Sequence, residues 1–173
     1  MSNRSEKKYN EAKNKELWDR VGKELKAYED KTFLEQYGLY MLRVQMYELY
    51  LKQDLIELFD VPEEKADRMN LASILRYYEK NDIRAHPILY ANLTEISKQR
   101  NSMAHEFLAA AGNASMIAGE TGMHFFYKDL NRWAMDLELA FQQYLMLKET
   151  DMLYKDCGVK PTFPYPKYDE LDE

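Results

Sequence analysis

The sequence contains very little cysteine, glycine or proline. Its single cysteine, Cys157, excludes an internal disulfide and a zinc site built on several cysteines. With 6 glycines and 5 prolines in 173 residues, the chain has few of the residues that interrupt helices. The prolines, at positions 62, 87, 161, 164 and 166, fall outside the strongly periodic segments. This scarcity is typical of a helical protein.

Long apolar runs are also missing. No stretch approaches the roughly 18 apolar residues in a row that indicate a membrane span. The N-terminal stretch MSNRSEKKYNEAKNKELW has no apolar signal core. We therefore expect a cytoplasmic protein without a membrane partner. Basic residues are not in excess either, because 30 acidic and 24 basic side chains give a net charge of −6. That balance argues against a general nucleic-acid coat protein but allows a local basic cleft.

Apolar residues make up 46% of the chain, enough for the core of one ordinary domain. Their spacing follows helical periodicity, which is clearest over residues 33–59, where one face carries Tyr37, Tyr40, Val44, Tyr47 and Leu51. The spacings predict helices over residues 5–29, 33–59, 63–80, 87–108 and 123–149. Glycines 112, 119 and 122 are expected to form the connection between the last two helices.

The predicted fold is all-α, an up-and-down bundle of about five helices. Segments 33–59 and 123–149 should form its spine, with 87–108 packed beside them. We expect the helical domain to span residues 1–150. Residues 151–173 differ in being rich in proline and tyrosine and acidic at the end. They predict an extended tail in which aromatic residues such as Phe163, Tyr165 and Tyr168 dock on a helical surface.

The stretch RNSMAHEF, residues 100–107, places an arginine and a histidine five residues apart in a helical region. On one uninterrupted helix, Arg100 and His105 would point about 140° apart. One interpretation is that Arg100 extends to solvent from an apolar stripe and that His105 is simply exposed. Another is that the helix restarts at Asn101 or Ser102, since both are good N-cap residues, and so re-aims His105.

Arg100, Asn101, Ala104 and His105, set between a preceding and a following helix, resemble the R-x4-6-H signature of the HEPN family. The resemblance covers roughly residues 33 to 148 and includes the order of long and short helices. It implies a HEPN-like bundle and a metal-independent endoribonuclease without a cofactor, often a toxin or an antiviral-defence effector, that works as a homodimer. In that role His105 would be the acid or base, Arg100 would hold the phosphate, and Asn101 would orient a neighbour or cap the helix.

Such a reaction needs two proton-transfer groups, and one chain supplies only one motif histidine. A two-fold dimer would supply both. The sequence departs from the family at one position. Family members that are silenced by nucleotide transfer onto a tyrosine carry that tyrosine two residues after the histidine. Here Phe107 occupies this position and has no hydroxyl to modify. An antitoxin or another regulatory protein would be a further partner.

Arg76, Arg84 and Lys98 are candidates for a basic, RNA-binding rim, although they could equally be scattered surface charges. No spacing of His, Cys or carboxylates indicates a metal site, and His86 and His124 look like single surface histidines. The alternative function is a non-catalytic HEPN-like dimerisation module. A third is a factor that binds a host protein through the aromatic tail.

Overall fold

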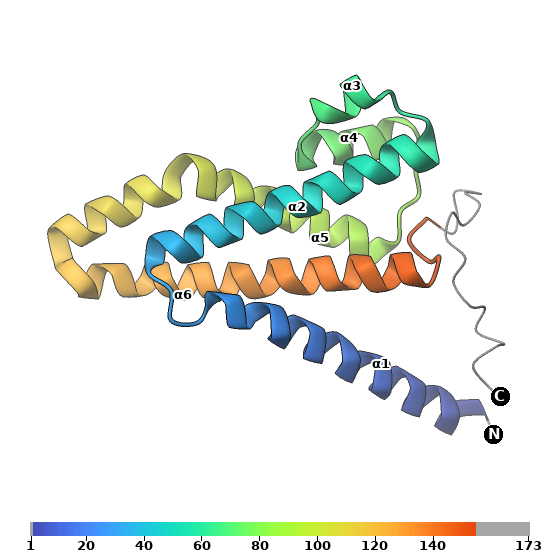
Figure 1. Ribbon diagram of the computed structural model, residues 1–173, viewed down its shortest axis with the longest axis horizontal. Coiled ribbons are helices and arrows are strands. Elements are labelled where there is room, and N and C mark those ends of the chain that lie inside the picture. The colour runs from blue at the N-terminus through green and yellow to red at the C-terminus, as the bar shows by residue number, and fades with distance from the viewer. Residues whose placement is uncertain (1, 155–173) are drawn as a thin grey trace.

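In the computed structural model, the backbone is described for residues 2–154, and side chains are described for residues 11–154 except 118, 120 and 121. All regular structure in that part of the chain is helical, which confirms the all-α prediction (Figure 1). The predicted docking residues Phe163, Tyr165 and Tyr168 lie outside the described residues. The elements are α1 (Ser2–Leu25), the 3-10 turn η1 (Lys26–Tyr28), α2 (Phe33–Phe59), α3 (Glu63–Asp67), α4 (Leu71–Lys80), α5 (Pro87–Ser102), the π-helical turn η2 (Met103–Phe107) and α6 (Leu108–Glu149).

Helix α2 has the bounds that the sequence predicts. It begins with a capping box, in which the Glu35 backbone N–H donates to the Thr32 hydroxyl and the Thr32 N–H donates to the Glu35 carboxylate. It ends at Asp60, whose positive φ of 52° breaks the helix just before Pro62. Strong signals at both ends explain why the prediction is confirmed to the residue.

The predicted helix over 63–80 is wrong, because two short helices, α3 and α4, occupy that segment. The break falls at Asn70, which has an extended backbone and caps α4. Its side-chain oxygen accepts the Ser73 backbone N–H at 2.9 Å. Asparagine is among the best N-cap residues, and here it starts a new helix.

Helix α5, turn η2 and the first residues of α6 form one long arm, and the rest of α6 returns beside it (Figure 1). The reversal occurs at Gly119, the residue inside α6 with non-helical angles (φ 56°, ψ −137°). The connection predicted at three glycines is therefore correct for Gly119 only, since Gly112 and Gly122 lie within helix. The fourth helical segment likewise runs past its predicted end at residue 108. We call these two antiparallel segments, residues 87–118 and 120–149, the outgoing and return arms.

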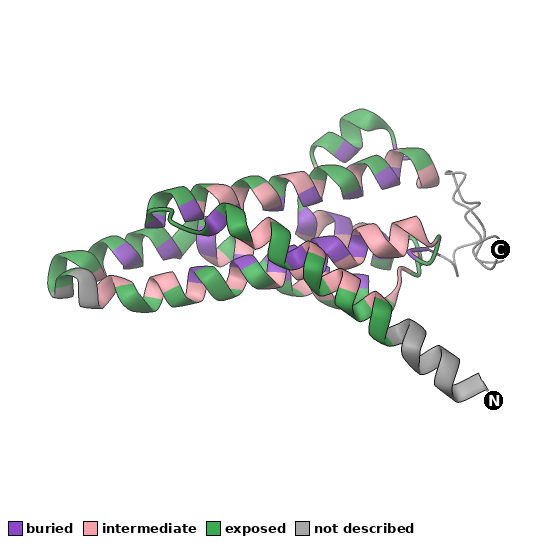
Figure 2. Ribbon diagram, turned by 60° about the horizontal axis from the view of Figure 1, so that its bottom comes forward, coloured by how far each residue is buried: buried purple, intermediate pink, exposed green. Residues whose placement is uncertain are grey.

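The core lies where α2 packs on both arms of this hairpin, as the buried segments in Figure 2 show. The Asn92 amide donates to Gln143 at 2.7 Å and so joins the two arms. The Arg20 guanidinium pairs with Glu149 at 2.9 Å and ties α1 to the return arm. None of the described helices has the length and apolar character needed to cross a membrane.

The core continues past residue 150, the predicted end of the helical domain. Leu153 and Tyr154 are both buried. The backbone carbonyl of Leu153 accepts the N–H of His86 at 2.9 Å, and the hydroxyls of Tyr154 and Tyr78 are 2.7 Å apart. The first residues assigned to the tail therefore belong to the helical domain.

Two fully buried carboxylates join α2 to the return arm. Arg43 forms a bidentate ion pair with Glu138, with both N–O distances at 2.7 Å. Asp54 accepts the Lys148 ammonium at 2.6 Å and the Tyr144 hydroxyl at 2.8 Å. Burial raises the pKa of the Asp54 carboxyl above its ordinary value of 3.8, although these hydrogen bonds oppose the shift.

Candidate functional site

The arginine–histidine motif lies where α5 passes into the π turn η2. Ser102 and Met103 have ordinary helical angles, and the Met103 N–H still bonds to the carbonyls of Gln99 and Arg100. The interpretation in which the helix restarts at Asn101 or Ser102 is therefore wrong. Instead the helix widens for one turn, with i→i+5 hydrogen bonds. Such turns are rare inside helices and are frequently found at functional sites.

The spacing of buried residues gives a physical reason for this turn. Four positions at intervals of four, Gln99, Met103, Phe107 and Ala111, are all buried. On a regular α-helix each such interval drifts by about 40°, so three of them would drift by about 120°. A wider turn rotates less per residue, which keeps the four positions facing the core.

The same turn sets the exposure of the motif. Arg100 is half-buried and donates to the side-chain oxygen of Asn101 at 3.4 Å, whereas Asn101 and His105 are exposed. Because the turn rotates less per residue, the angle between Arg100 and His105 falls below the roughly 140° of a regular helix. Among the described residues, no hydrogen bond or ion pair involves the His105 side chain, so it is open to a ligand.

Helix α2 contacts the segment that carries the motif, from the core side, at three successive points. They are Tyr40 Oη donating to Gln99 Oε1 at 3.3 Å, Tyr37 Oη donating to the Met103 carbonyl at 3.1 Å, and the Phe33 ring stacked on Phe107 with centroids 5.8 Å apart. Arg100 lies between the first two points in sequence, and His105 lies between the last two. The Gln99 amide also donates to Asp136 on the return arm at 3.0 Å. The motif therefore stands on a well-anchored backbone.

Phe107 is a core residue of this site. It is 5% exposed, and its ring also contacts those of Phe126 and Trp133, at centroid distances of 5.3 and 5.1 Å. The side chain two residues after His105 is thus enclosed by aromatic rings.

The predicted basic rim does not gather around Arg100. Lys98 is exposed, but two helical steps place it on a different side of α5. Arg84 is exposed in the loop before α5, roughly 20 Å from Arg100 at helical rise, and pairs with Asp82. Arg76 lies on α4, where it donates to the Ser73 hydroxyl.

The remaining histidines have local roles. His86 caps α5 through Nδ1, which accepts the Ile88 N–H at 3.3 Å, and His124 is exposed beside Phe125. Within the described part of the chain, no three His, Cys, Asp or Glu side chains come together in a way that could hold a metal ion.

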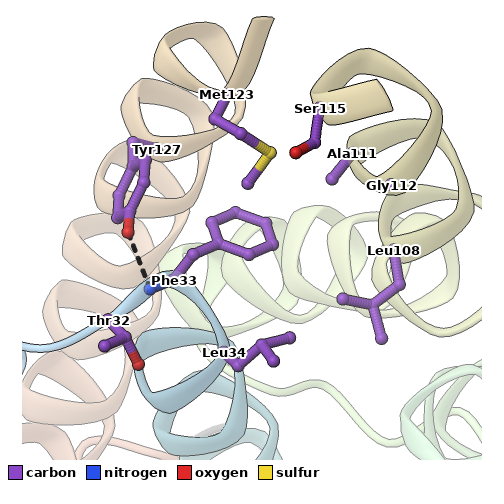
Figure 3. Close-up of a pocket in the computed structure, with 9 residues that line it drawn as sticks. All are labelled: Thr32, Phe33, Leu34, Leu108, Ala111, Gly112, Ser115, Met123 and Tyr127. Atoms are coloured by element: carbon purple, nitrogen blue, oxygen red, sulfur yellow. Dashed lines mark hydrogen bonds between the residues drawn. The ribbon is translucent and has the colours of Figure 1, made fainter. Parts of the chain in front are cut away.

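An apolar groove lies next to the motif. Its volume is about 510 Å³, and it opens between the start of α2 and the two arms of the hairpin (Figure 3). The Phe33 ring stands in it, and the Met123 thioether and the Ser115 hydroxyl lie next to each other on one side of the ring. Leu108 reaches it from a position one helical turn after His105. Its lining is Thr32, Phe33, Leu34, Leu108, Ala111, Gly112, Ser115, Met123 and Tyr127.

Large apolar side chains are exposed around the groove and at the end of the hairpin. Met116 and Ile117 are each 87% exposed, and Phe125 and Leu34 are each 68% exposed. We call these four residues, together with the groove, the hairpin-end surface. Sequence reasoning missed it because three separate segments build it; the adjacent Met116 and Ile117 beside a reversal were the available signal.

Comparison of the chain with protein-family models, with curated proteins and with solved structures finds no match.

Proposed function

We propose that this protein is a metal-independent endoribonuclease of the HEPN type that acts as a homodimer. The observation that carries the proposal is the R-x4-H motif on an anchored π turn, with His105 and Asn101 exposed beside a half-buried Arg100. Wide turns are rare and are frequently found at functional sites. This favours a chemical role for Arg100 and His105 over the interpretation that they are two unrelated surface side chains. The all-α hairpin that carries the motif is consistent with the helical order of the resemblance.

The residues fit the chemistry of RNA cleavage at the 2′-hydroxyl. An imidazole can accept or donate a proton, so His105 can remove the proton of that hydroxyl or protonate the leaving 5′-oxygen. The Arg100 guanidinium can bind two phosphate oxygens at once and stabilise the charge that develops at phosphorus. The products are a 2′,3′-cyclic phosphate and a free 5′-hydroxyl. Asn101, which already accepts a hydrogen bond from Arg100, would hold the guanidinium in place.

A second copy of the chain would supply the second histidine. The hairpin-end surface suits such an interface, because large exposed apolar side chains and an apolar groove are both found at this end of the molecule. In a two-fold dimer one surface meets itself, so projections of each copy can enter the groove of the other. The groove begins one turn from His105, and a dimer built on it would bring the two motifs close together.

Cleavage is tested with purified wild type, His105→Ala and His124→Ala on total RNA in the presence of EDTA. His124 is another exposed histidine, outside the motif, and serves as the matched control. Loss of one proton-transfer group typically slows a reaction by about 10²–10⁴-fold. We expect that loss for His105→Ala, full activity for His124→Ala, and a 2′,3′-cyclic phosphate at the new ends. Equal cleavage by all three proteins would refute the assignment.

The interface is tested with Ile117→Asp and, as its control, Leu49→Asp, which changes an exposed leucine on α2. Light scattering should show a dimer for wild type and for Leu49→Asp, and a monomer for Ile117→Asp. A monomeric wild type, or a dimer that survives Ile117→Asp, would refute this interface.

The second candidate function is a non-catalytic dimerisation module, favoured by the exposed apolar side chains of the hairpin-end surface. The two proposals separate in one experiment. A folded, dimeric wild type that cleaves no RNA and causes no growth defect when expressed would support the module. A growth defect relieved by His105→Ala would support a toxin or defence effector, whose inhibitor would be an antitoxin or another regulatory protein.

A further inference from the structure

Helix α2 makes three contacts with the motif region, and the middle one lies between the two motif residues in sequence. Gln99, held by Tyr40, precedes Arg100, and Phe107, stacked on Phe33, follows His105. The Tyr37 hydroxyl holds the Met103 carbonyl at 3.1 Å, between the arginine and the histidine. It is therefore the contact placed to fix how one motif residue is rotated relative to the other.

Met103 also marks the change from α-helix to π turn. Its N–H makes an α-helical bond to the Gln99 carbonyl and also bonds to the Arg100 carbonyl three residues back, and the wide turn begins at this residue. A backbone that changes hydrogen-bond pattern has competing arrangements close in energy, since the wide turn can slide along the helix. A fixed hydroxyl on the carbonyl of the first residue favours one of these arrangements.

We infer that Tyr37 is a positioning residue for the Arg100–His105 pair: it holds the π turn at residues 103–107 and so sets the angle between the two side chains. This inference rests on the proposed ribonuclease function. Tyr37 need not touch the substrate, because it acts through the backbone of Met103. The side chain is half-buried and donates outward from α2, so its aromatic ring can remain in place when the hydroxyl is removed.

The test is Tyr37→Phe in the full-length protein, compared with wild type and with Tyr144→Phe. The control also loses one tyrosine hydroxyl bonded to a partner, here Asp54 at 2.8 Å, but at the other end of the hairpin. Amide hydrogen exchange of residues 103–108 reports on the turn directly. We expect about fivefold faster exchange there in Tyr37→Phe, the effect of losing one hydrogen bond, and no selective change at these residues in Tyr144→Phe.

RNA cleavage kinetics test the link to function. A displaced catalytic group can lower turnover by up to about 100-fold without weakening substrate binding, so we expect Tyr37→Phe to lower kcat at an unchanged KM. Tyr144→Phe should leave both constants unchanged.

The outcomes are separable. Unchanged exchange at 103–108, or a change matched by Tyr144→Phe, refutes the claim that Tyr37 holds the turn, whatever the RNA result. Faster local exchange at an unchanged kcat refutes the positioning role while the ribonuclease stands. Absence of cleavage by wild type refutes the ribonuclease and the positioning role with it, and the exchange data then still decide whether the hydroxyl holds the turn.

Discussion

A single-residue deletion tests the physical origin of the π turn most directly. If the turn absorbs one extra residue, deleting exposed Ala104 inside it should restore a regular α-helix and leave the segments on both sides in register with the core. Deleting exposed Lys98, in the regular part of α5, should instead rotate one side of the helix by about 100°.

The spacing of the buried residues gives the size of the difference. With Ala104 present, Gln99 to Ala111 spans twelve residues, which on an α-helix drifts by about 120°. With Ala104 removed it spans eleven residues, and the drift falls to about 20°. The positions that face the core stay together, so the deletion should cost the roughly 0.5–3 kcal/mol of an ordinary single change.

Deletion of Lys98 has no such compensation. It turns Leu93 and Ile96, or else Met103 and Phe107, away from α2 and the return arm, and all four side chains are buried. Loss of one large buried side chain costs about 2–5 kcal/mol, against a total stability of about 5–15 kcal/mol. We expect this variant to be unfolded or to lose cooperative unfolding.

Urea denaturation followed by circular dichroism measures both variants against wild type. The expected result is one cooperative transition at a modestly lower midpoint for the Ala104 deletion, and none for the Lys98 deletion. Equal damage by the two deletions would show that the turn does not absorb an extra residue, and the spacing of the buried positions would then not explain it.

Two further predictions concern the buried carboxylates. Arg43→Met should destabilise the fold by about 3–5 kcal/mol because it leaves Glu138 charged and buried without its partner, and Arg43→Met combined with Glu138→Leu should recover much of that loss in chemical denaturation. For Asp54, whose pKa is raised by burial, the folded state holds the proton more tightly than the unfolded state, so its contribution to stability is present below pH 3.8 and is lost as pH rises through the raised pKa. The stability of wild type relative to Asp54→Asn should therefore rise on acidification toward pH 3.8, and a difference that falls instead would contradict the raised pKa.

Much of the fold could be predicted from the sequence, because local signals and the apolar pattern agree. For α2, the capping residues Thr32 and Glu35, a long apolar face and the stop at Asp60 all favour the same helix. Around residue 70 they conflict, since the apolar pattern continues while Asn70 caps a new helix. The reversal was ambiguous for another reason: every glycine tolerates positive φ, and only packing of the two arms selects Gly119.

The candidate site could be predicted in part. The sequence names Arg100 and His105 but cannot show that α2 holds the backbone between them. Tyr37 was expected only as part of an apolar face, because periodicity reports where a ring lies and not where its hydroxyl donates. The spacing of four that accompanies the wide turn was visible, but Gln99 is polar and does not register as a core position.

The hairpin reverses at one residue, Gly119. This single position therefore determines whether the return arm packs within its own molecule or on another copy. Gly119 has open space where a side chain would begin, so a larger residue would meet no steric contact there. The obstacle is the backbone, since φ 56° with ψ −137° is poorly accessible to any residue with a side chain. With helical angles at this position, the two arms would join in one rod of roughly 95 Å. The return arm would then lie out of reach of its own α2 and could bury its apolar face only on another copy.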